Sequence, residues 1–150
     1  MPQPTALDSL IEFARGQRDD ALSRFAASMT ETRAAEQRLS LLLGYRDDYA
    51  ARLATMVRGG LTVGQLRNFR LFLDKLDLAI RQQQQAASSH TEHLADQRVT
   101  WTDSETRLLG YSSLLDRRRA SDRLRLRRDE QRGTDEHASR ICAARSKQEI

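Results

Sequence analysis

Proline is absent from Thr5 to Ile150, and this absence constrains the fold more than any other feature of the 150-residue sequence. Proline interrupts helices because it lacks a backbone N–H, so no such interruption exists beyond position 4. A β-sandwich or barrel needs a turn signal roughly every 8–12 residues, and this chain has one dense cluster of turn residues. We therefore expect an all-α protein built from long helices.

Apolar residues recur every 3.5 residues along two stretches of the chain. Alternating steps of four and three from Leu7 to Met56 reach fifteen positions, of which eleven are apolar, whereas the whole chain is 39% hydrophobic. The same steps from Leu66 to Leu115 again find eleven apolar residues at fifteen positions. A repeat of 3.5 residues held over this length is typical of a left-handed coiled coil. We call these thirty positions the seam.

Three glycines, Gly59, Gly60 and Gly64, separate the two stretches. Gly59 or Gly60 can adopt the left-handed conformation that ends a helix. Thr62 is a candidate N-cap for a second helix, and Gln65 completes a capping box. These features predict a long antiparallel two-helix coiled coil, a helical hairpin. We expect one coiled-coil domain over 1–150, with helices over about 5–57 and 63–140, a turn at 58–64 and a frayed tail at 141–150.

The net charge of +4 comes entirely from the last quarter of the chain. Residues 1–115 carry 14 basic and 14 acidic side chains, whereas residues 116–150 carry 11 basic and 7 acidic ones. Seven of these basic residues form what we call the arginine block: Arg117, Arg118, Arg119, Arg123, Arg125, Arg127 and Arg128. Such a cluster attracts phosphates or an acidic protein surface. Acidic residues interrupt it and no aromatic residue follows Tyr111, so a solvated helix, an acidic partner and a nucleic acid remain alternatives.

The region around the glycines contains more apolar side chains than a two-stranded seam can bury. The surplus consists of Leu41, Leu43, Tyr45, Leu71, Phe72 and Leu78, and Leu10 and Phe13 form a smaller surplus near the N-terminus. Exposed apolar clusters mark interaction sites. We therefore expect a partner-binding surface here, with a locally thickened hairpin or a helix rotated in register as the alternative.

The sequence gives no sign of an active site, a metal centre or a cofactor site. Enzymes need a cleft, which a two-helix hairpin does not provide. His90, His93, His137 and Cys142 are too scattered to supply the convergent ligands of a zinc site. The N-terminus lacks the pattern of a signal peptide, and no window approaches the roughly 20 apolar residues of a membrane span. We expect a cytoplasmic protein that is not an enzyme and uses no metal, cofactor or small-molecule substrate.

Several stretches resemble the FliJ family of the flagellar type III export apparatus, from about Ala6 to Arg140. The segment from Asn68 to Ile80 resembles the family's N-[YF]-x-x-F-[IL]-x-x-L-x-x-A-I run. Further matches are Ala6-Leu7, Asp19-Asp20-Ala21, Ala35-Glu36, Leu39 through Leu42 and Tyr45-x-x-x-Tyr49-x-x-x-Leu53. Residues outside the seam, such as Tyr45 and Phe72, are the more specific matches, because unrelated coiled coils share a heptad pattern.

The resemblance implies a coiled coil similar to the central stalk subunit of rotary ATPases. It also implies three partners: the export ATPase hexamer, the cytoplasmic linker of the membrane export gate, and emptied substrate chaperones. The export-gate residues that it implies, which we call the gate patch, are Leu42, Tyr45, Tyr49, Phe72, Leu76 and Ala79. Two neighbours, Arg38 and Gln83, depart from the residues common in the family, glutamine and histidine.

For the ATPase ring, the candidate residues are Leu10, Phe13, Arg117, Arg118, Arg119 and Arg123, which we call the ring set. The implied location is the cytoplasm, with peripheral recruitment to the inner membrane at the flagellar base. Two alternatives remain: a coiled-coil protein that binds nucleic acid through its arginine-rich tail, and the equivalent stalk of a virulence-type secretion system.

Overall fold

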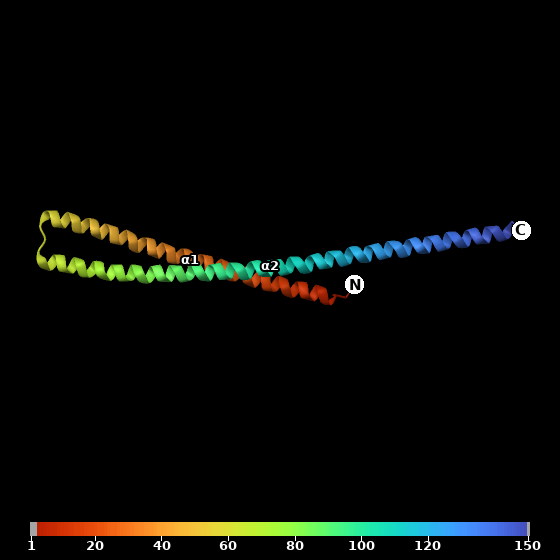
Figure 1. Ribbon diagram of the computed structural model, residues 1–150, viewed down its shortest axis with the longest axis horizontal. Coiled ribbons are helices and arrows are strands. Elements are labelled where there is room, and N and C mark those ends of the chain that lie inside the picture. Colours follow the sequence, from red (N-terminus) through yellow and green to blue (C-terminus); the bar gives the residue numbers. More distant parts are fainter. Residues whose placement is uncertain (1–2, 150) are drawn as a thin grey trace. The chain divides into compact units, whose positions relative to one another are not determined.

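The computed structural model describes residues 3–149, which form two helices and, within that range, no strand. Helix α1 spans Ala6–Gly59 and helix α2 spans Val63–Gln148, and Figure 1 shows the chain reversing direction between them. The all-α helical hairpin is therefore confirmed. The described residues divide into a hairpin unit, residues 16–105, and a terminal unit, residues 3–15 with 106–149. The single domain over 1–150 stays a prediction.

The turn between the helices is built by glycine and by a reciprocal cap. Gly60 has a φ of 91°, in the left-handed region that a side chain disfavours, and its N–H donates to the carbonyl of Val57 at 3.4 Å. The Gln65 N–H donates to Thr62 Oγ1 at 3.2 Å, and the Thr62 N–H donates to Gln65 Oε1 at 3.2 Å. This capping box satisfies two N–H groups at the start of α2, as the sequence predicted.

The seam predicted by the 3.5-residue repeat is the buried face of both helices. All thirty seam positions lie within the described residues, and Arg46 and Met56 are the two whose side chains are exposed. In the hairpin unit the buried apolar residues are Ala21, Phe25, Ala35, Leu76, Ile80 and Ala87. Burial of these side chains removes apolar surface from water and holds α1 against α2.

Polar groups inside the seam bond across the two helices of the hairpin unit. The Thr32 Oγ1 atom lies 2.7 Å from the carbonyl oxygen of Ser28 and 3.2 Å from that of His90, so its proton is shared between them. The Gln83 Nε2 group donates to the carbonyl of Ala35 at 3.0 Å. These hydrogen bonds give both polar seam residues an acceptor on the opposite helix, which offsets the cost of removing them from water.

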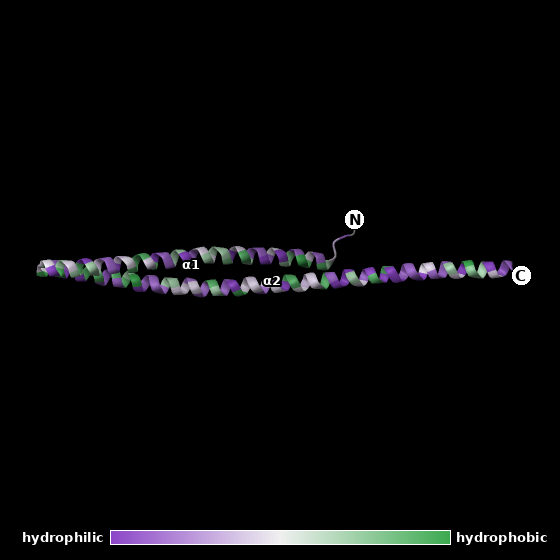
Figure 2. Ribbon diagram, turned by 90° about the horizontal axis from the view of Figure 1, so that it is seen from above, coloured by the Kyte–Doolittle hydropathy of each residue, from purple (hydrophilic) through white to green (hydrophobic). Residues whose placement is uncertain are grey.

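The terminal unit has a small core and a long unpartnered helical segment. Leu7, Tyr111 and Leu115 pack around buried Ile11, Ala14 and Leu108, whereas every side chain from 116 to 149 is exposed. In Figure 2 the C-terminal part of α2 is mostly hydrophilic, with isolated hydrophobic turns.

Helix α2 continues to Gln148, past the end expected near residue 140. The segment beyond 140 contains no proline and is rich in alanine, arginine, lysine and glutamine, which favour helix. Gly133 lies within the helix and does not end it. Frayed structure was expected for 141–150, but residues 141–148 are helical, and residue 150 lies outside the described residues.

Candidate functional site

An aromatic cluster lies beside the glycine turn in the hairpin unit. The Tyr49 and Phe72 rings stack at a centroid distance of 4.2 Å and an interplanar angle of 25°. Phe69 contacts the same tyrosine at 5.9 Å in a tilted arrangement, and the Arg52 guanidinium lies 5.9 Å from the tyrosine ring centroid. Stacked and tilted aromatic pairs add stability beyond the area they bury. Tyr49 therefore holds the Phe72 ring in place while Phe72 remains 41% exposed.

The other gate-patch residues differ in their exposure. Tyr45 is 56% exposed, Leu42 and Ala79 are half-buried, and Leu76 is 8% exposed. Leu76 is thus part of the hairpin core. The gate patch as a binding surface stays a prediction, and its accessible side chains are those of Tyr45 and Phe72.

The heptad positions explain why Tyr45, Phe72 and Ala79 belong to one surface. Each of the three comes directly before a seam residue at heptad position a, and so occupies position g. In an antiparallel coiled coil the g positions of both helices line the same side of the seam. The sequence therefore brings these three residues, from two helices, onto one flank of the hairpin unit.

The surplus apolar side chains near the turn are exposed, as expected. Leu41, Leu71 and Leu78 are 58%, 55% and 54% exposed, and Leu43 is 37% exposed. A thickened hairpin would bury these side chains, so their exposure disfavours that alternative. They extend the apolar surface beyond the gate patch, onto the outer faces of the helices.

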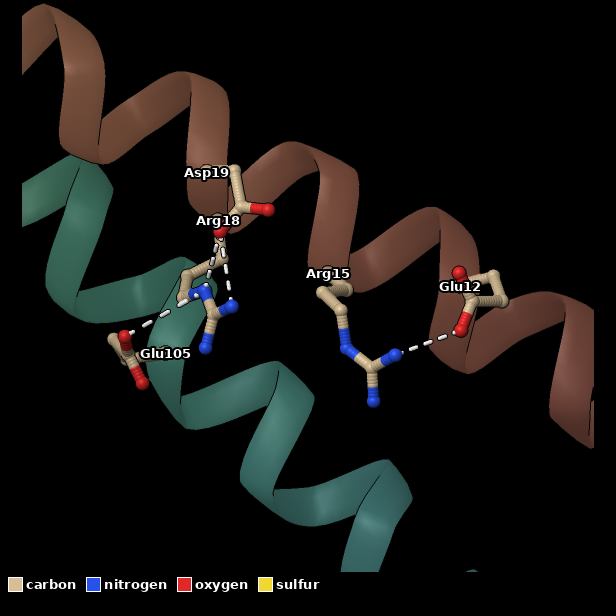
Figure 3. A network of polar contacts seen from close by, with 5 residues as sticks. All are labelled: Glu12, Arg15, Arg18, Asp19 and Glu105. Atoms are coloured by element: carbon tan, nitrogen blue, oxygen red, sulfur yellow. Dashed lines mark hydrogen bonds and ion pairs between the residues drawn. The ribbon is translucent and has the colours of Figure 1, made fainter.

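Arginines on the seam of the hairpin unit are held by carboxylates at its edge. Arg46 Nε lies 3.3 Å from Asp77 Oδ1. Figure 3 shows Arg18, whose Nη2 lies 2.9 Å from Asp19 Oδ1 and whose Nε lies 3.8 Å from Glu105 Oε1 on α2. Exposed ion pairs of this kind contribute roughly 0–1 kcal/mol each. Their main effect is to keep the two guanidinium charges at the surface, away from the apolar core.

A second aromatic layer crosses the hairpin unit at Phe25 and Trp101. These rings stack at 5.5 Å with an interplanar angle of 9°, and the Arg98 guanidinium lies 5.6 Å from the Phe25 centroid. Sequence reasoning placed both aromatic residues on the seam but did not identify the layer. Pairing the two seams in antiparallel register would have placed these two aromatic residues near each other, and so could have predicted the layer.

The ring set lies in the terminal unit and is exposed. Leu10 and Phe13 are 40% and 64% exposed, and Arg117, Arg118, Arg119 and Arg123 are all exposed. A shallow groove beside this region is lined by Gln3, Pro4, Thr5, Asp8, Leu115, Arg118, Arg119 and Asp122. The structure therefore brings part of the arginine block to the start of α1.

Asp8 is the titratable group at this groove whose pKa departs from its ordinary value. The Thr5 hydroxyl donates to Asp8 Oδ2 at 2.7 Å and the Thr5 N–H donates at 2.8 Å. These two hydrogen bonds lower the pKa of Asp8, first the hydroxyl and then the backbone. Desolvation opposes them, and the charges of Arg119 and then Arg118 lower the pKa by still smaller amounts. The Asp8 N–H in turn lies 3.3 Å from Thr5 Oγ1, so Thr5 and Asp8 form a second capping box.

Another ion pair in the terminal unit links one turn of α1 to the next. Arg15 Nη1 lies 2.8 Å from Glu12 Oε1, as Figure 3 shows.

Among residues 3–149, no group of three or more histidine, cysteine, aspartate or glutamate side chains is placed to hold a metal ion. In the same range, neither helix has a stretch apolar enough to cross a bilayer.

Comparison with known proteins identifies the family. The family model described as "Flagellar FliJ protein" matches residues 3–147. The chain is 29% identical to the flagellar FliJ protein of Salmonella typhi and 27% identical to that of Escherichia coli strain K12. Each match extends over 142 residues and covers 95% of this chain and 97% of the relative. Because the family model covers nearly the whole chain, the protein belongs to the FliJ family of flagellar export components.

Proposed function

We propose that this protein is a non-enzymatic coupling component of flagellar export with two separate binding surfaces. The gate patch in the hairpin unit binds the cytoplasmic linker of the membrane export gate. The ring set in the terminal unit binds the export ATPase hexamer. The protein also escorts emptied substrate chaperones, and works in the cytoplasm, recruited peripherally to the inner membrane at the flagellar base.

One observation supports the gate patch above all. The Phe72 ring is fixed by stacking on Tyr49 at 4.2 Å, yet it remains 41% exposed beside Tyr45. Binding hot spots are commonly aromatic side chains that are held in place before the partner arrives, since less conformational entropy is then lost. The rings of Tyr45 and Phe72 lie outside the buried seam, so their exposure is best explained by a partner.

Replacement of Phe72 by alanine tests the gate patch. We expect the dissociation constant for the isolated export-gate linker to rise at least about tenfold, since truncated aromatic hot spots cost about 2 kcal/mol or more. Calorimetric titration measures this, and circular dichroism checks that helix content is unchanged. Val99→Ala is the matched control, because Val99 is 59% exposed on α2 of the same unit and lies outside the apolar surface near the turn. Wild-type affinity in the Phe72 variant would refute this assignment.

Charge reversal tests the ring set. The triple variant R117E/R118E/R119E is expected to lose most of the stimulation of ATP hydrolysis by the cognate export ATPase. The matched control R132E/R140E/R145E makes the same charge change at other exposed arginines of α2. If both triples stimulate hydrolysis equally, the three arginines have no specific role at the ring.

Nucleic acid remains a second candidate partner for the arginine block, since all seven of its arginines are exposed. Four acidic residues, Asp116, Asp122, Asp129 and Glu130, lie among or next to these arginines, and aromatic residues for base stacking are absent beyond Tyr111. Binding of the chain to DNA or RNA that weakens steeply with salt would favour this alternative.

A further inference from the structure

Acidic residues are missing from the part of the hairpin unit that surrounds the glycine turn. From Tyr49 to Leu73 the chain carries four arginines and neither aspartate nor glutamate. The remainder of the hairpin unit, 16–48 and 74–105, carries eight basic and twelve acidic residues. The hairpin unit therefore has a net charge of +4 around the turn and −4 elsewhere.

The four arginines are exposed and are distributed around both helices. Relative to the seam, Arg52 and Arg58 occupy heptad positions g and f of α1, and Arg67 and Arg70 occupy positions b and e of α2. Arg58 also lies in the last turn of α1, where a cation interacts favourably with the helix dipole. No acidic side chain lies within 49–73, and the nearest ones along the chain, Asp48 and Asp74, are one turn from Arg52 and Arg70, at the edge of this group.

Two valines expose apolar surface beside the turn. Val63, the first residue of α2, is 86% exposed, and Val57, in the last turn of α1, is 58% exposed. The turn itself does not require them, because Gly60 provides the reversal and Thr62 with Gln65 provides the cap. We call these six residues the turn surface: Arg52, Val57, Arg58, Val63, Arg67 and Arg70.

We propose that the turn surface docks on an anionic phospholipid bilayer, with the valines in the headgroup region and the arginines against lipid phosphates. Basic residues next to exposed apolar side chains are the usual combination in peripheral membrane binding. A lipid surface can place phosphates around arginines that point in several directions. A specific protein interface instead needs about 800 Å² of complementary surface on each partner.

This inference rests on the peripheral membrane recruitment in the proposed function and deepens it, because it names lipid as a direct partner where no export protein is involved. The turn surface also differs from the arginine block, because acidic side chains interrupt that block and none belongs to the turn surface. The contact is peripheral, in keeping with the absence of a spanning helix within residues 3–149.

Vesicle sedimentation with the full chain tests the proposal. Vesicles of phosphatidylcholine with about 30% phosphatidylglycerol should bind the protein, pure phosphatidylcholine vesicles should not, and binding should fall steeply as salt is added. R58E/R67E should lower the partition coefficient at least about tenfold, since each basic residue near an anionic membrane contributes a factor of about five. V57S/V63S should lower it several-fold and leave the salt dependence unchanged.

The control R140E/R145E makes the same charge change at exposed arginines outside the arginine block and should bind like the wild type. Circular dichroism verifies that all variants keep their helix content. Equal binding to both kinds of vesicle, undiminished binding by R58E/R67E, or an equal loss in the control would each overturn the proposal. An acidic protein surface would then be the better match for the turn surface.

Discussion

The paired helices of the hairpin unit and the segment of α2 from 116 to 148 have the same backbone conformation but different surroundings. In the first region the seam is buried, so that Leu76 is 8% exposed. In the second every side chain is exposed, including Leu124 at 49% and Leu126 at 62%. Helical conformation thus follows from local propensity in both regions, whereas only the paired region gains stability from packing.

This difference separates the two regions in rigidity as well. Most helical stability in proteins comes from the packing of an apolar face, and helices without it are marginal in water. The hairpin unit supplies that packing internally through α1. The segment 116–148 of α2 has no such packing within the described residues, so its helix depends on local propensity alone.

A matched pair of isoleucine substitutions gives the largest expected contrast. Ile80 is 3% exposed and Ile141 is 44% exposed. Ile80→Ala should lower the free energy of unfolding by about 2–4 kcal/mol, because it removes buried methyl groups and leaves a cavity. Ile141→Ala should change it by less than about 0.5 kcal/mol. Urea denaturation followed by circular dichroism measures both changes. Similar losses of unfolding free energy in the two variants would show that the two regions do not differ in packing.

A matched pair of glycine substitutions compares the same two regions, with a smaller expected change in stability. An added Cβ at Gly16 or Gly133 meets no atom within 4 Å, so alanine fits at both positions. Each replacement should stabilise the helix by about 1 kcal/mol. For Gly16→Ala the gain should appear in the main unfolding transition. For Gly133→Ala it should appear only as stronger amide-exchange protection nearby, and a shift of the main transition would show that the segment unfolds together with the hairpin.

Acidification gives the smallest effect, confined to the start of α1. Because hydrogen bonds from Thr5 hold the pKa of Asp8 below its ordinary value of 3.8, the ionised carboxylate stabilises the folded state. This stability is fully present above the ordinary pKa and is lost as pH falls through the lower folded-state pKa. Amide exchange in the first turn should therefore speed up in that range. In Asp8→Asn the change with pH should disappear, and if it persists, Asp8 is not its cause.

The sequence was sufficient to predict the hairpin because its signal is repeated many times. Each seam residue lies where the 3.5-residue repeat places it, with Arg46 and Met56 exposed at the edge. Arg46 reaches outward to Asp77, an adjustment that no periodicity contains. The end of α2 was placed too early because Gly133 and the polar residues after it were given more weight than the absence of proline.

The candidate site was less predictable, because it depends on side-chain rotamers. The pattern indicated that Phe72 lies outside the seam, but the stacking on Tyr49 follows from the rotamers of both rings. For Leu76, periodicity placed the residue on the seam while the family resemblance placed it in the gate patch, and its 8% exposure agrees with the periodicity. The arginines and valines around the glycine turn were not recognised from sequence, because charge was compared only between the two ends of the chain.

The hydrogen bonds that Thr32 and Gln83 make to carbonyls of the opposite helix have a mechanical consequence. Sliding one arm past the other by part of a heptad would break both bonds between the helices. Gln83 Nε2 would then lose its acceptor, whereas Thr32 would keep its bond to the Ser28 carbonyl within α1. The hairpin therefore resists slippage under an axial load. A pull or push on one arm is transmitted to the other as a displacement of the whole pair.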